Sequence, residues 1–365
     1  MALLFPGVLV EGSSYECGRS LGEQCRDRVH LSYEIYLRLL RGTGGPSPAR
    51  TPLAAACLGF LDRVRREDPA LLKEMQGIAD GARLALHQVA LINVRSELMS
   101  LSCCGARRSV SAGAGCTSFG VSGEASSTGG ALMAQTWDWM LACRQTLILQ
   151  EVRKAGARPF LMLTEAGLIG KLGINADGIG LCVNFLHPRQ ASLEGTASHV
   201  YLRRILESPT IALARAAVMR TRASAGINVM LADAAGHLLD LEISPCGVGV
   251  LLPCRGVLKH ANHYVSAGMN GASSATRQIP GSGERARRAG QILSQSPRPV
   301  GIENLKKALG DHQCQRGPIC AHAGCGPWQG WGTVCGVVVD PRGRSLHVAP
   351  GFPCETPFSQ VTLRP

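Results

Sequence analysis

The character of the sequence changes at Cys116, and this change constrains the fold more than any other feature. Upstream, the segment 16–29 has few helix breakers and places its charges on one side, and Asp68 and Pro69 fit an N-cap and a first helical position. Downstream, short apolar runs alternate with Gly, Pro and Asn turn signals, as is typical of strands. Helices followed by many strands and a few interspersed helices predict an α+β layered fold.

The strand candidates form a meander and end in a hairpin around 341–343. They are 117–121, 130–137, 146–152, 159–165, 178–186, 227–233, 237–243, 247–253, 333–340 and 344–350. Helices are predicted in the first hundred residues, near 200–219 and near 285–294, and a loop over 42–52. No repeat or strong linker divides the chain, so we expect one domain.

The segment 109–123 places a single thiol, Cys116, after small residues that allow a tight backbone bend. A thiol here could attack the carbonyl of Gly115, cut the chain and free the α-amine of Cys116, which then serves as the base for its own sulfur. The products would be a light piece, 1–115, and a heavy piece, 116–365, held together by a shared core. The alternative is a buried structural cysteine, one of fifteen in the chain.

Three polar residues in strand-like surroundings are candidates for catalysis. Asp138 could orient the new α-amine, or it could be a turn aspartate at the edge of a Trp-rich core. Asn184 could donate to a substrate carbonyl, or it could be a satisfied core amide. Asn262, in the polar run 260–264, could supply an oxyanion-hole donor. The two histidines of that run lack a nearby carboxylate in the sequence, which argues against a metal there.

Two further groups of polar residues allow more than one interpretation. His and Cys residues between 312 and 325 form the most zinc-like cluster, although their spacing is not that of a standard zinc knuckle; they are His312, Cys314, Cys320, His322 and Cys325. Arg95 and Glu97 could form an internal ion pair close to the cleavage site, or they could belong to a solvated helix end.

These segments together resemble the acyl-coenzyme A:6-aminopenicillanic acid acyltransferase family, a group of self-cleaving cysteine N-terminal nucleophile hydrolases. The segments that carry the resemblance run through most of the chain: Gly18 and Gly22, 74–81, 93–97, 115–117, 137–139, Asn184, Asn228, 240–242, 260–264, 311–312 and 351–354. The resemblance implies a four-layer αββα sandwich of the N-terminal nucleophile type. It also implies that Cys116 is the nucleophile, that Asp138 holds its amine, and that Asn262 is the oxyanion donor with Asn184 beside it.

The sequence departs from the family pattern at three positions. The related bile salt hydrolases and acid ceramidase carry arginine where this chain has Gln135, and the family often shows Asn at Thr136. It also often shows Cys-Arg-His where this chain has Ala321 as the middle residue, so that the role of this arginine is vacant or passes to Arg285.

Four residues are accordingly predicted to bind substrate: Thr117, Gln135, Arg285 and His322. The resemblance implies no metal, because the family segment that corresponds to 312–322 has no known metal.

Composition narrows the classes of partner. The net charge of +12 is dispersed in separate clusters and aromatic residues are only 4%, which argues against a nucleic-acid platform and suits a small anionic substrate or coenzyme. No apolar run reaches membrane-spanning length, and the apolar N-terminus lacks a basic region and contains Pro6, so neither a membrane span nor a signal peptide is expected. Reduced thiols in a cytoplasmic or organellar protein are predicted.

The sequence thus predicts an autoprocessing amidohydrolase that cleaves a small N-acyl or β-alanyl amide through a thioester, without a resident cofactor. One alternative is an acyl-coenzyme A-dependent N-acyltransferase with the coenzyme A thioester as co-substrate. Two others are a catalytically inactive relative that binds a ligand, and a zinc-binding interaction protein built on 312–325.

Overall fold

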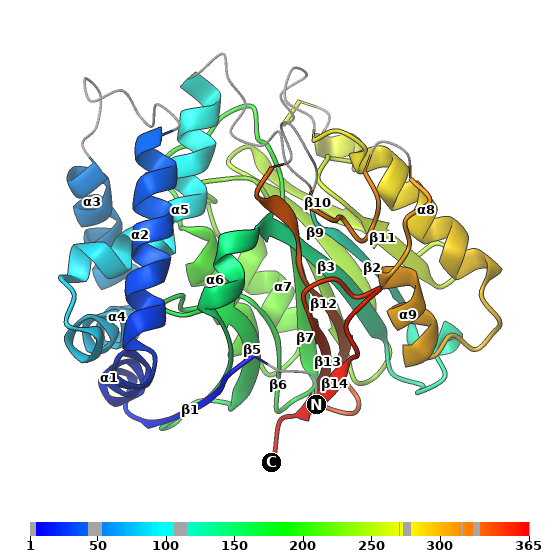
Figure 1. The fold of residues 1–365 in the computed structure, drawn as a ribbon, viewed down its shortest axis with the longest axis horizontal. Coiled ribbons are helices and arrows are strands. Elements are labelled where there is room, and N and C mark those ends of the chain that lie inside the picture. The colour runs from blue at the N-terminus through cyan, green and yellow to red at the C-terminus, as the bar shows by residue number, and fades with distance from the viewer. Residues whose placement is uncertain are drawn as a thin grey trace.

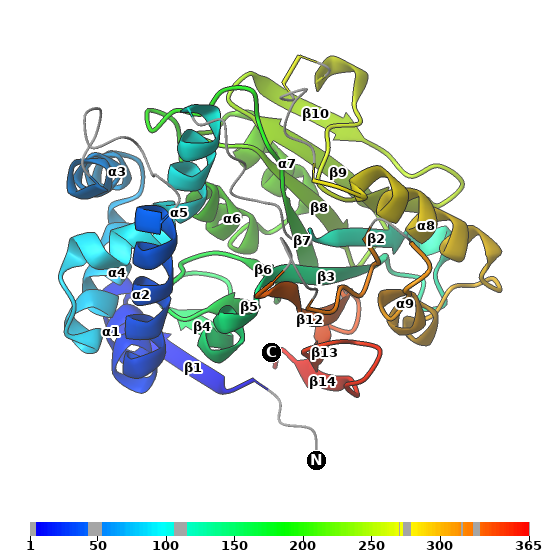
Figure 2. The same ribbon diagram turned by 45° about the horizontal axis from the view of Figure 1, so that its top comes forward.

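A computed structural model describes residues 5–42, 53–105, 115–269, 271–272, 279–314, 317–323 and 329–364. Two stacked sheets form the centre of the molecule, and helices cover the outer face of each sheet (Figures 1 and 2). This arrangement confirms the predicted α+β class and the four-layer αββα sandwich. Residues 43–52 of the predicted loop 42–52, the run 109–114 and Cys325 lie outside the described residues, and Gly42 ends α2.

The larger sheet has eight strands in the order β1-β4-β5-β6-β7-β8-β9-β10. Their bounds are β1 Gly7–Gly12, β4 Leu147–Lys154, β5 Phe160–Glu165, β6 Leu172–Asn175, β7 Ile179–Phe185, β8 Ile227–Asp233, β9 Leu238–Ser244 and β10 Gly247–Leu251. From β4 to β10 each strand pairs antiparallel with the next, which confirms the predicted meander.

The first strand corrects the expectation that the first hundred residues are helical. β1 pairs in parallel with β4, from Gly7 opposite Leu149 to Gly12 opposite Lys154. Its Val8 and Val10 are buried, so that the start of the chain is held at the edge of the larger sheet. A partner 142 positions away leaves no local signal in the sequence, which explains why this strand was missed.

The smaller sheet has six strands in the order β11-β2-β3-β12-β13-β14 and is antiparallel throughout. Its strands are β2 Thr117–Val121, β3 Leu132–Met140, β11 Val257–His260, β12 Trp331–Asp340, β13 Ser345–Pro350 and β14 Ser359–Thr362. β12 and β13 form the predicted final hairpin, whereas β6, β11 and β14 are not among the predicted strands.

The helices divide between the two outer layers (Figure 2). On the side of the larger sheet lie α1 Ser14–Gln24, α2 Arg26–Gly42, α3 Leu53–Glu67, α4 Pro69–Ala82, α5 Leu86–Gly105, α6 Ser198–Leu206 and α7 Ile211–Met219. On the side of the smaller sheet lie α8 Ser282–Gln295, which packs on β2 and β11, and α9 Ile302–Leu309, which packs on β3 and β12. The helix predicted near 200–219 is therefore two helices. Among the described helices, none combines the length and the apolar character that a membrane span requires.

Helices α1 and α4 approach each other closely enough to require glycine. A Cβ on Gly18 would lie 2.0 Å from the Glu74 carbonyl oxygen, and one on Gly77 would lie 2.1 Å from that of Tyr15. This contact gives a physical reason for the glycines of the segment 74–81. The predicted start of α4 is also confirmed, because Asp68 accepts a hydrogen bond from the amide of Leu71 at 3.0 Å.

Candidate active site

Cys116 directly precedes β2, in the layer between the two sheets. Its side chain is only 6% exposed, and its Sγ lies 3.7 Å from the backbone carbonyl oxygen of Asp138. Burial raises the pKa of the thiol to about 11, the charge of Asp138 adds to this rise, and Lys171 and Arg285 oppose it. The thiol is therefore protonated at neutral pH and requires a base before it can attack a carbonyl.

Asp138 on β3 has a buried carboxyl group, and one of its two oxygens has no hydrogen-bond partner among the described residues. Its Oδ1 accepts from the hydroxyl of Thr333 at 2.7 Å, whereas Oδ2 has no hydrogen-bond partner among the described residues. Burial raises the pKa of this carboxyl group to about 7, although Arg285 and the hydroxyl groups of Thr333 and Thr136 lower it. An open acceptor near Cys116 suits a new group with donor hydrogens, such as an α-ammonium group on that residue.

Arg285, in the first turn of α8, directs its guanidinium group at the backbone on both sides of the predicted cleavage site. Its Nη1 donates to the carbonyl oxygen of Gly115, to that of Cys116 at 2.8 Å and to Oγ1 of Thr117 at 2.8 Å. Its Nη2 donates to Oδ1 of Asn262 at 2.8 Å. Among the described residues, Arg285 donates to no carboxylate, and burial lowers its pKa. Within the described ranges, the hydrogen-bond acceptors that meet its positive charge are thus all neutral.

Asn262 lies against Gly115 and is held in place by three contacts. Its Nδ2 donates to the Phe185 carbonyl oxygen at 2.9 Å, its backbone amide donates to Oγ of Ser282 at 2.8 Å, and its Oδ1 accepts from Arg285. A Cβ on Gly115 would lie 2.2 Å from Oδ1 of Asn262 and 2.8 Å from Nη2 of Arg285. Only glycine fits at this position without displacing the two side chains.

The loop that carries Asn262 is fastened to β9 by Glu242. This carboxylate accepts from Nε2 of His260 at 2.8 Å, from the amide of Ser266 at 2.9 Å and from the amide of Val265. The run 260–264 gave no sign of this carboxylate, because Glu242 comes from a strand that is separate in the sequence. His260 therefore binds Glu242 and helps to hold the loop in place.

Asn184 and Gln135 both lie between the sheets, but they differ in how many of their side-chain donors and acceptors have hydrogen-bond partners. Oδ1 of Asn184 accepts from Oγ of Ser118 at 2.5 Å and from Nδ2 of Asn228 at 3.2 Å, whereas its own Nδ2 has no partner within the described part of the chain. Gln135 donates to the carbonyl oxygen of Val183 and accepts from its amide, both at 2.7 Å. We therefore interpret Gln135 as a tie between the sheets rather than as a substrate contact.

Two other predicted substrate-binding residues have different surroundings. Thr117 is fully buried, and its hydroxyl group accepts from Arg285, so that it positions the guanidinium group. His322 stacks on Phe352 with a centroid separation of 4.1 Å and lies 3.1 Å from Sγ of Cys354, in a separate cluster.

The expected ion pair between Arg95 and Glu97 is wrong, and so is the alternative of a solvated helix end. Both residues are buried. Arg95 pairs with Glu165, and Glu97 accepts from the amide and the hydroxyl group of Ser198, both at 2.7 Å.

Sequence reasoning missed two residues at the site. The ammonium group of Lys171 lies 4.6 Å from the ring centroid of Trp137, and burial lowers its pKa to about 8. The hydroxyl group of Thr333 on β12 links Asp138 to Ala321. It donates a hydrogen bond to the carboxyl group of Asp138 and accepts one from the backbone amide of Ala321 at 2.8 Å. A single lysine between two strands and a threonine within a strand carry no signal that would have distinguished them.

Comparison with known proteins relates the chain to acyl-transferring enzymes. The model of the family described as acyl-coenzyme A:6-aminopenicillanic acid acyl-transferase matches residues 126–353. The acyl-coenzyme A:6-aminopenicillanic-acid-acyltransferase 40 kDa form of Emericella nidulans is 27% identical over 354 residues, which are 95% of this chain and 92% of that protein.

Solved structures are less similar. Penicillin V acylase from Agrobacterium tumefaciens is 14% identical with a TM-score of 0.43, over 68% of this chain and 86% of that one. A variant of conjugated bile acid hydrolase from Clostridium perfringens is 10% identical with a TM-score of 0.41, over 68% and 97%. The four-layer fold therefore rests on the layers described above and not on these two similarities.

Proposed function

Because the chain belongs to the acyl-coenzyme A:6-aminopenicillanic acid acyl-transferase family, we propose that it is an autoprocessing cysteine amidohydrolase with Cys116 as its nucleophile. Its substrate is a small N-acyl or β-alanyl amide. One observation carries this proposal: the guanidinium group of Arg285 binds the carbonyl oxygen of Gly115, whose carbon is the one that the Cys116 thiol would attack.

Self-cleavage follows from these contacts in two steps. Sγ of Cys116 attacks the carbonyl carbon of Gly115, and the thiol proton passes to the amide nitrogen as the peptide C–N bond breaks. The released α-amine then takes up a second proton from solvent and becomes an ammonium group. Water then attacks the resulting thioester, which frees the carboxylate of Gly115 and the thiol. Arg285 stabilises the oxyanion of each step, and the open Oδ2 of Asp138 receives the new ammonium group.

The two pieces, 1–115 and 116–365, would remain associated after the cut. β1 belongs to the light piece and pairs along its whole length with β4 of the heavy piece. Arg203 on α6 of the heavy piece binds both carboxylate oxygens of Glu74 on α4, at 2.8 and 2.7 Å. These contacts do not depend on the peptide bond before Cys116.

The same groups serve an external amide. Its carbonyl takes the position that the Gly115 carbonyl leaves, beside Arg285 and the amide group of Asn262. The α-amine of Cys116 accepts the thiol proton, the thiolate attacks, the substrate amine departs with a proton, and water hydrolyses the thioester. The adjacent ammonium group lowers the pKa of the thiol once the chain has been cut.

Acyl transfer to an amine is the alternative outcome of the same chemistry. The name of the Emericella nidulans relative supports it, and the net charge of +12 suits an anionic coenzyme A thioester as co-substrate. We favour hydrolysis because water is always available to resolve the thioester. No resident cofactor is required in either case.

Self-cleavage is tested on the purified protein by a denaturing gel, intact mass and N-terminal sequencing. Wild type should give two fragments, and the heavy fragment should begin at Cys116. Cys116→Ala should give a single chain, whereas Cys57→Ser, at another buried cysteine, should leave cleavage unchanged. A wild-type chain that stays intact would refute the proposal and would favour a binding protein.

The reaction is tested by a mass-spectrometric screen of small N-acyl and β-alanyl amides with the cut enzyme and with Cys116→Ala. We expect wild type alone to release the amine and to carry a transient acyl mass on the heavy fragment. Adding an acyl-coenzyme A with a competing amine separates the alternatives, because N-acylated product in excess of free acid identifies an acyltransferase.

A further inference from the structure

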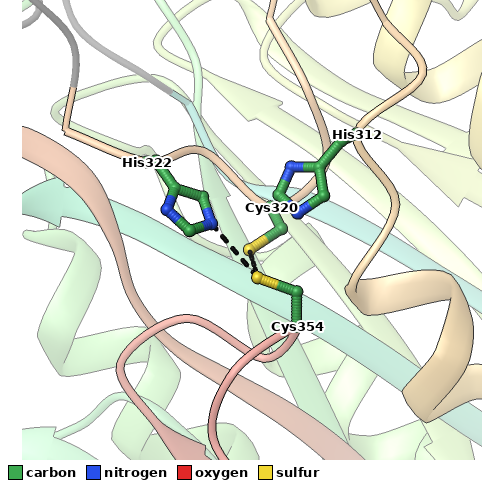
Figure 3. A group of neighbouring side chains, drawn as sticks. All are labelled: His312, Cys320, His322 and Cys354. Atoms are coloured by element: carbon green, nitrogen blue, oxygen red, sulfur yellow. Dashed lines mark hydrogen bonds between the residues drawn. The ribbon is translucent and has the colours of Figure 1, made fainter.

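Two histidines and two cysteines meet near the start of β12 and the end of β13, outside the site described above. They are His312, Cys320, His322 and Cys354, and one ligand atom from each lies within 4.8 Å of the others (Figure 3). They come from three segments: the stretch after α9, the stretch 317–323 and the turn that follows β13. We propose that this cluster is a structural Zn²⁺ site.

The spacing of the ligand atoms is close to that of a tetrahedral zinc site. Sγ of Cys320 lies 3.5 Å from Sγ of Cys354, and Nε2 of His322 lies 3.1 Å from the latter. Bond lengths of about 2.3 Å to sulfur and about 2.0 Å to nitrogen place tetrahedral ligand atoms roughly 3.3–3.8 Å apart. These two pairs therefore need changes of only a few tenths of an ångström, and all the ligand atoms already lie within 4.8 Å of one another.

The His322 ring is already oriented as a ligand. Its Nδ1 lies 3.6 Å from a carboxylate oxygen of Glu355, while Nε2 faces the Cys354 sulfur. Metal-bound histidines commonly direct their second nitrogen at a carboxylate, which fixes the tautomer and the ring orientation. Stacking on Phe352 holds the same ring from one face.

Charge and exposure also fit zinc. On binding, the two thiols release their protons to water, and two thiolates with two neutral imidazoles balance the charge of the ion. Four protein ligands fill the tetrahedron, which is characteristic of structural rather than catalytic sites. His312, His322 and Cys354 are exposed, so the ion can enter from solvent, and only Cys320 is buried.

The cluster differs from the one that the sequence indicated. His312, Cys320 and His322 are shared, but Cys354 lies 32 positions beyond His322 and replaces Cys314 in the set. The proposed site therefore shares three residues with the zinc-like sequence pattern, and its fourth ligand comes from the turn after β13.

A metal here would act on the active site through Ala321, which lies between two of the ligands. Ala321 exchanges hydrogen bonds with Thr333, its amide donating to Oγ1 at 2.8 Å and its carbonyl oxygen accepting from the Thr333 amide at 2.7 Å. The Thr333 hydroxyl group donates in turn to Asp138. The ion would thus fix the stretch that positions the carboxyl group of Asp138. The site itself does not depend on the proposed amidase activity.

Metal analysis of the purified full chain, grown with zinc, tests the site directly. We expect about one zinc per chain in wild type and less than a tenth of that in Cys354→Ser and His322→Ala. Cys314→Ser is the matched control and should retain the metal. Zinc well below one equivalent in wild type, or full zinc in Cys354→Ser, would overturn the proposal.

Two further measurements keep the proposal testable if a variant folds poorly. Cobalt-substituted wild type should show thiolate-to-cobalt charge-transfer absorption, which Cys354→Ser should lose, and a spectrum of oxygen and nitrogen ligation only would contradict the site. Peptide mapping without reduction should find Cys320 and Cys354 unlinked, whereas a disulfide between them would replace the metal as the explanation of their proximity.

Discussion

Two buried arginines, Arg203 and Arg285, show how the same side chain serves different purposes in two regions of this molecule. Each is 1% exposed. Arg203 lies between the helical layer and the larger sheet, where it binds both carboxylate oxygens of Glu74, and its Nε donates to Glu207 at 2.9 Å. Arg285 lies at the smaller sheet and donates to two carbonyl oxygens, a hydroxyl group and an amide.

The difference in partners changes the electrostatic state of the two groups. Burial lowers the pKa of both, but the carboxylates of Glu74 and Glu207 reverse this for Arg203, whose pKa is raised. The pKa of Arg285 stays lowered because the charges of Asp138 and Cys116 offset only part of the effect of burial. A guanidinium charge that is not neutralised can stabilise an oxyanion at the carbonyl it binds, whereas a neutralised one mainly holds two elements together.

The largest expected effect is on stability, at Arg203. Arg203→Leu leaves the buried Glu74 without its partner and should lower the free energy of unfolding by about 3–5 kcal/mol. Urea denaturation of the uncut Cys116→Ala background measures this change. Adding Glu74→Leu should recover most of the loss, and the Arg203→Leu chain that does fold should still cleave itself when Cys116 is present. A loss that the second substitution does not reduce would contradict the ion-pair interpretation.

At Arg285 we expect a large effect on the rate of self-cleavage and a small effect on stability, the reverse of Arg203. Arg285→Leu should slow self-cleavage by about 10²–10³-fold, because one donor to an oxyanion is worth roughly that factor, and should destabilise the protein less than Arg203→Leu does. A time course of fragment formation on gels measures the rate. Arg285→Lys keeps the charge without the forked geometry and should lie in between. Cleavage at the wild-type rate in Arg285→Leu would break the proposed distinction between the two arginines.

Local patterns in the sequence were sufficient for much of the fold and for part of the site. The strands next to Cys116 and Asp138 could be predicted because β2 and β3 are close in the sequence. The pairing of Thr117 with Thr136 in these strands brings Cys116 and Asp138 near each other. The Asn262 loop was also found, since its polar run interrupts an apolar context. These features depend on periodicity and short connections, which the sequence shows directly.

The remaining features depend on contacts between distant segments. The family resemblance suggested Arg285, but this residue is one of three arginines in a single helix, with Arg287 and Arg288. Only the packing of α8 on β2 shows that it reaches Gly115. Two other residues come from segments far from their partners in the chain: Glu242, which supports the Asn262 loop, and Cys354, the fourth ligand of the proposed zinc site. Local sequence patterns carry no signal for such contacts.

A smaller effect is expected at Gly115, which Arg285 and Asn262 enclose. In Gly115→Ala the new Cβ meets Oδ1 of Asn262, and because both neighbouring side chains are tied by hydrogen bonds, the carbonyl must move away from Arg285. Misplacement of a reacting group by about 1 Å can cost about 10²-fold, so we expect cleavage to slow by roughly 10–100-fold. Gly113→Ala, two residues before the predicted cut, is the matched control. Equal rates for the two variants would show that Gly115 is not held tightly.

A further effect depends on pH and concerns the carboxyl group of Asp138, whose pKa the charge of Arg285 lowers. In the uncut chain the pKa of Asp138 is about 7, above its ordinary value of 3.8, because burial disfavours the charged form. The folded chain therefore binds this proton more tightly than the unfolded chain does. The resulting stability is complete below pH 4 and is lost as the pH rises through 7, with a slope of at most about 1.4 kcal/mol per pH unit.

Urea denaturation of Cys116→Ala with and without Asp138→Asn, at intervals from pH 5 to 8, isolates this contribution because other titrating groups are common to both chains. We expect the advantage of the aspartate chain at pH 5 to diminish toward pH 8. A constant difference would mean that Arg285 already neutralises Asp138 as Glu74 neutralises Arg203, and that the two regions are alike. A diminishing difference would mean that Asp138 stays open for the ammonium group that the cut creates, and that Arg285 keeps its charge for the carbonyl under attack.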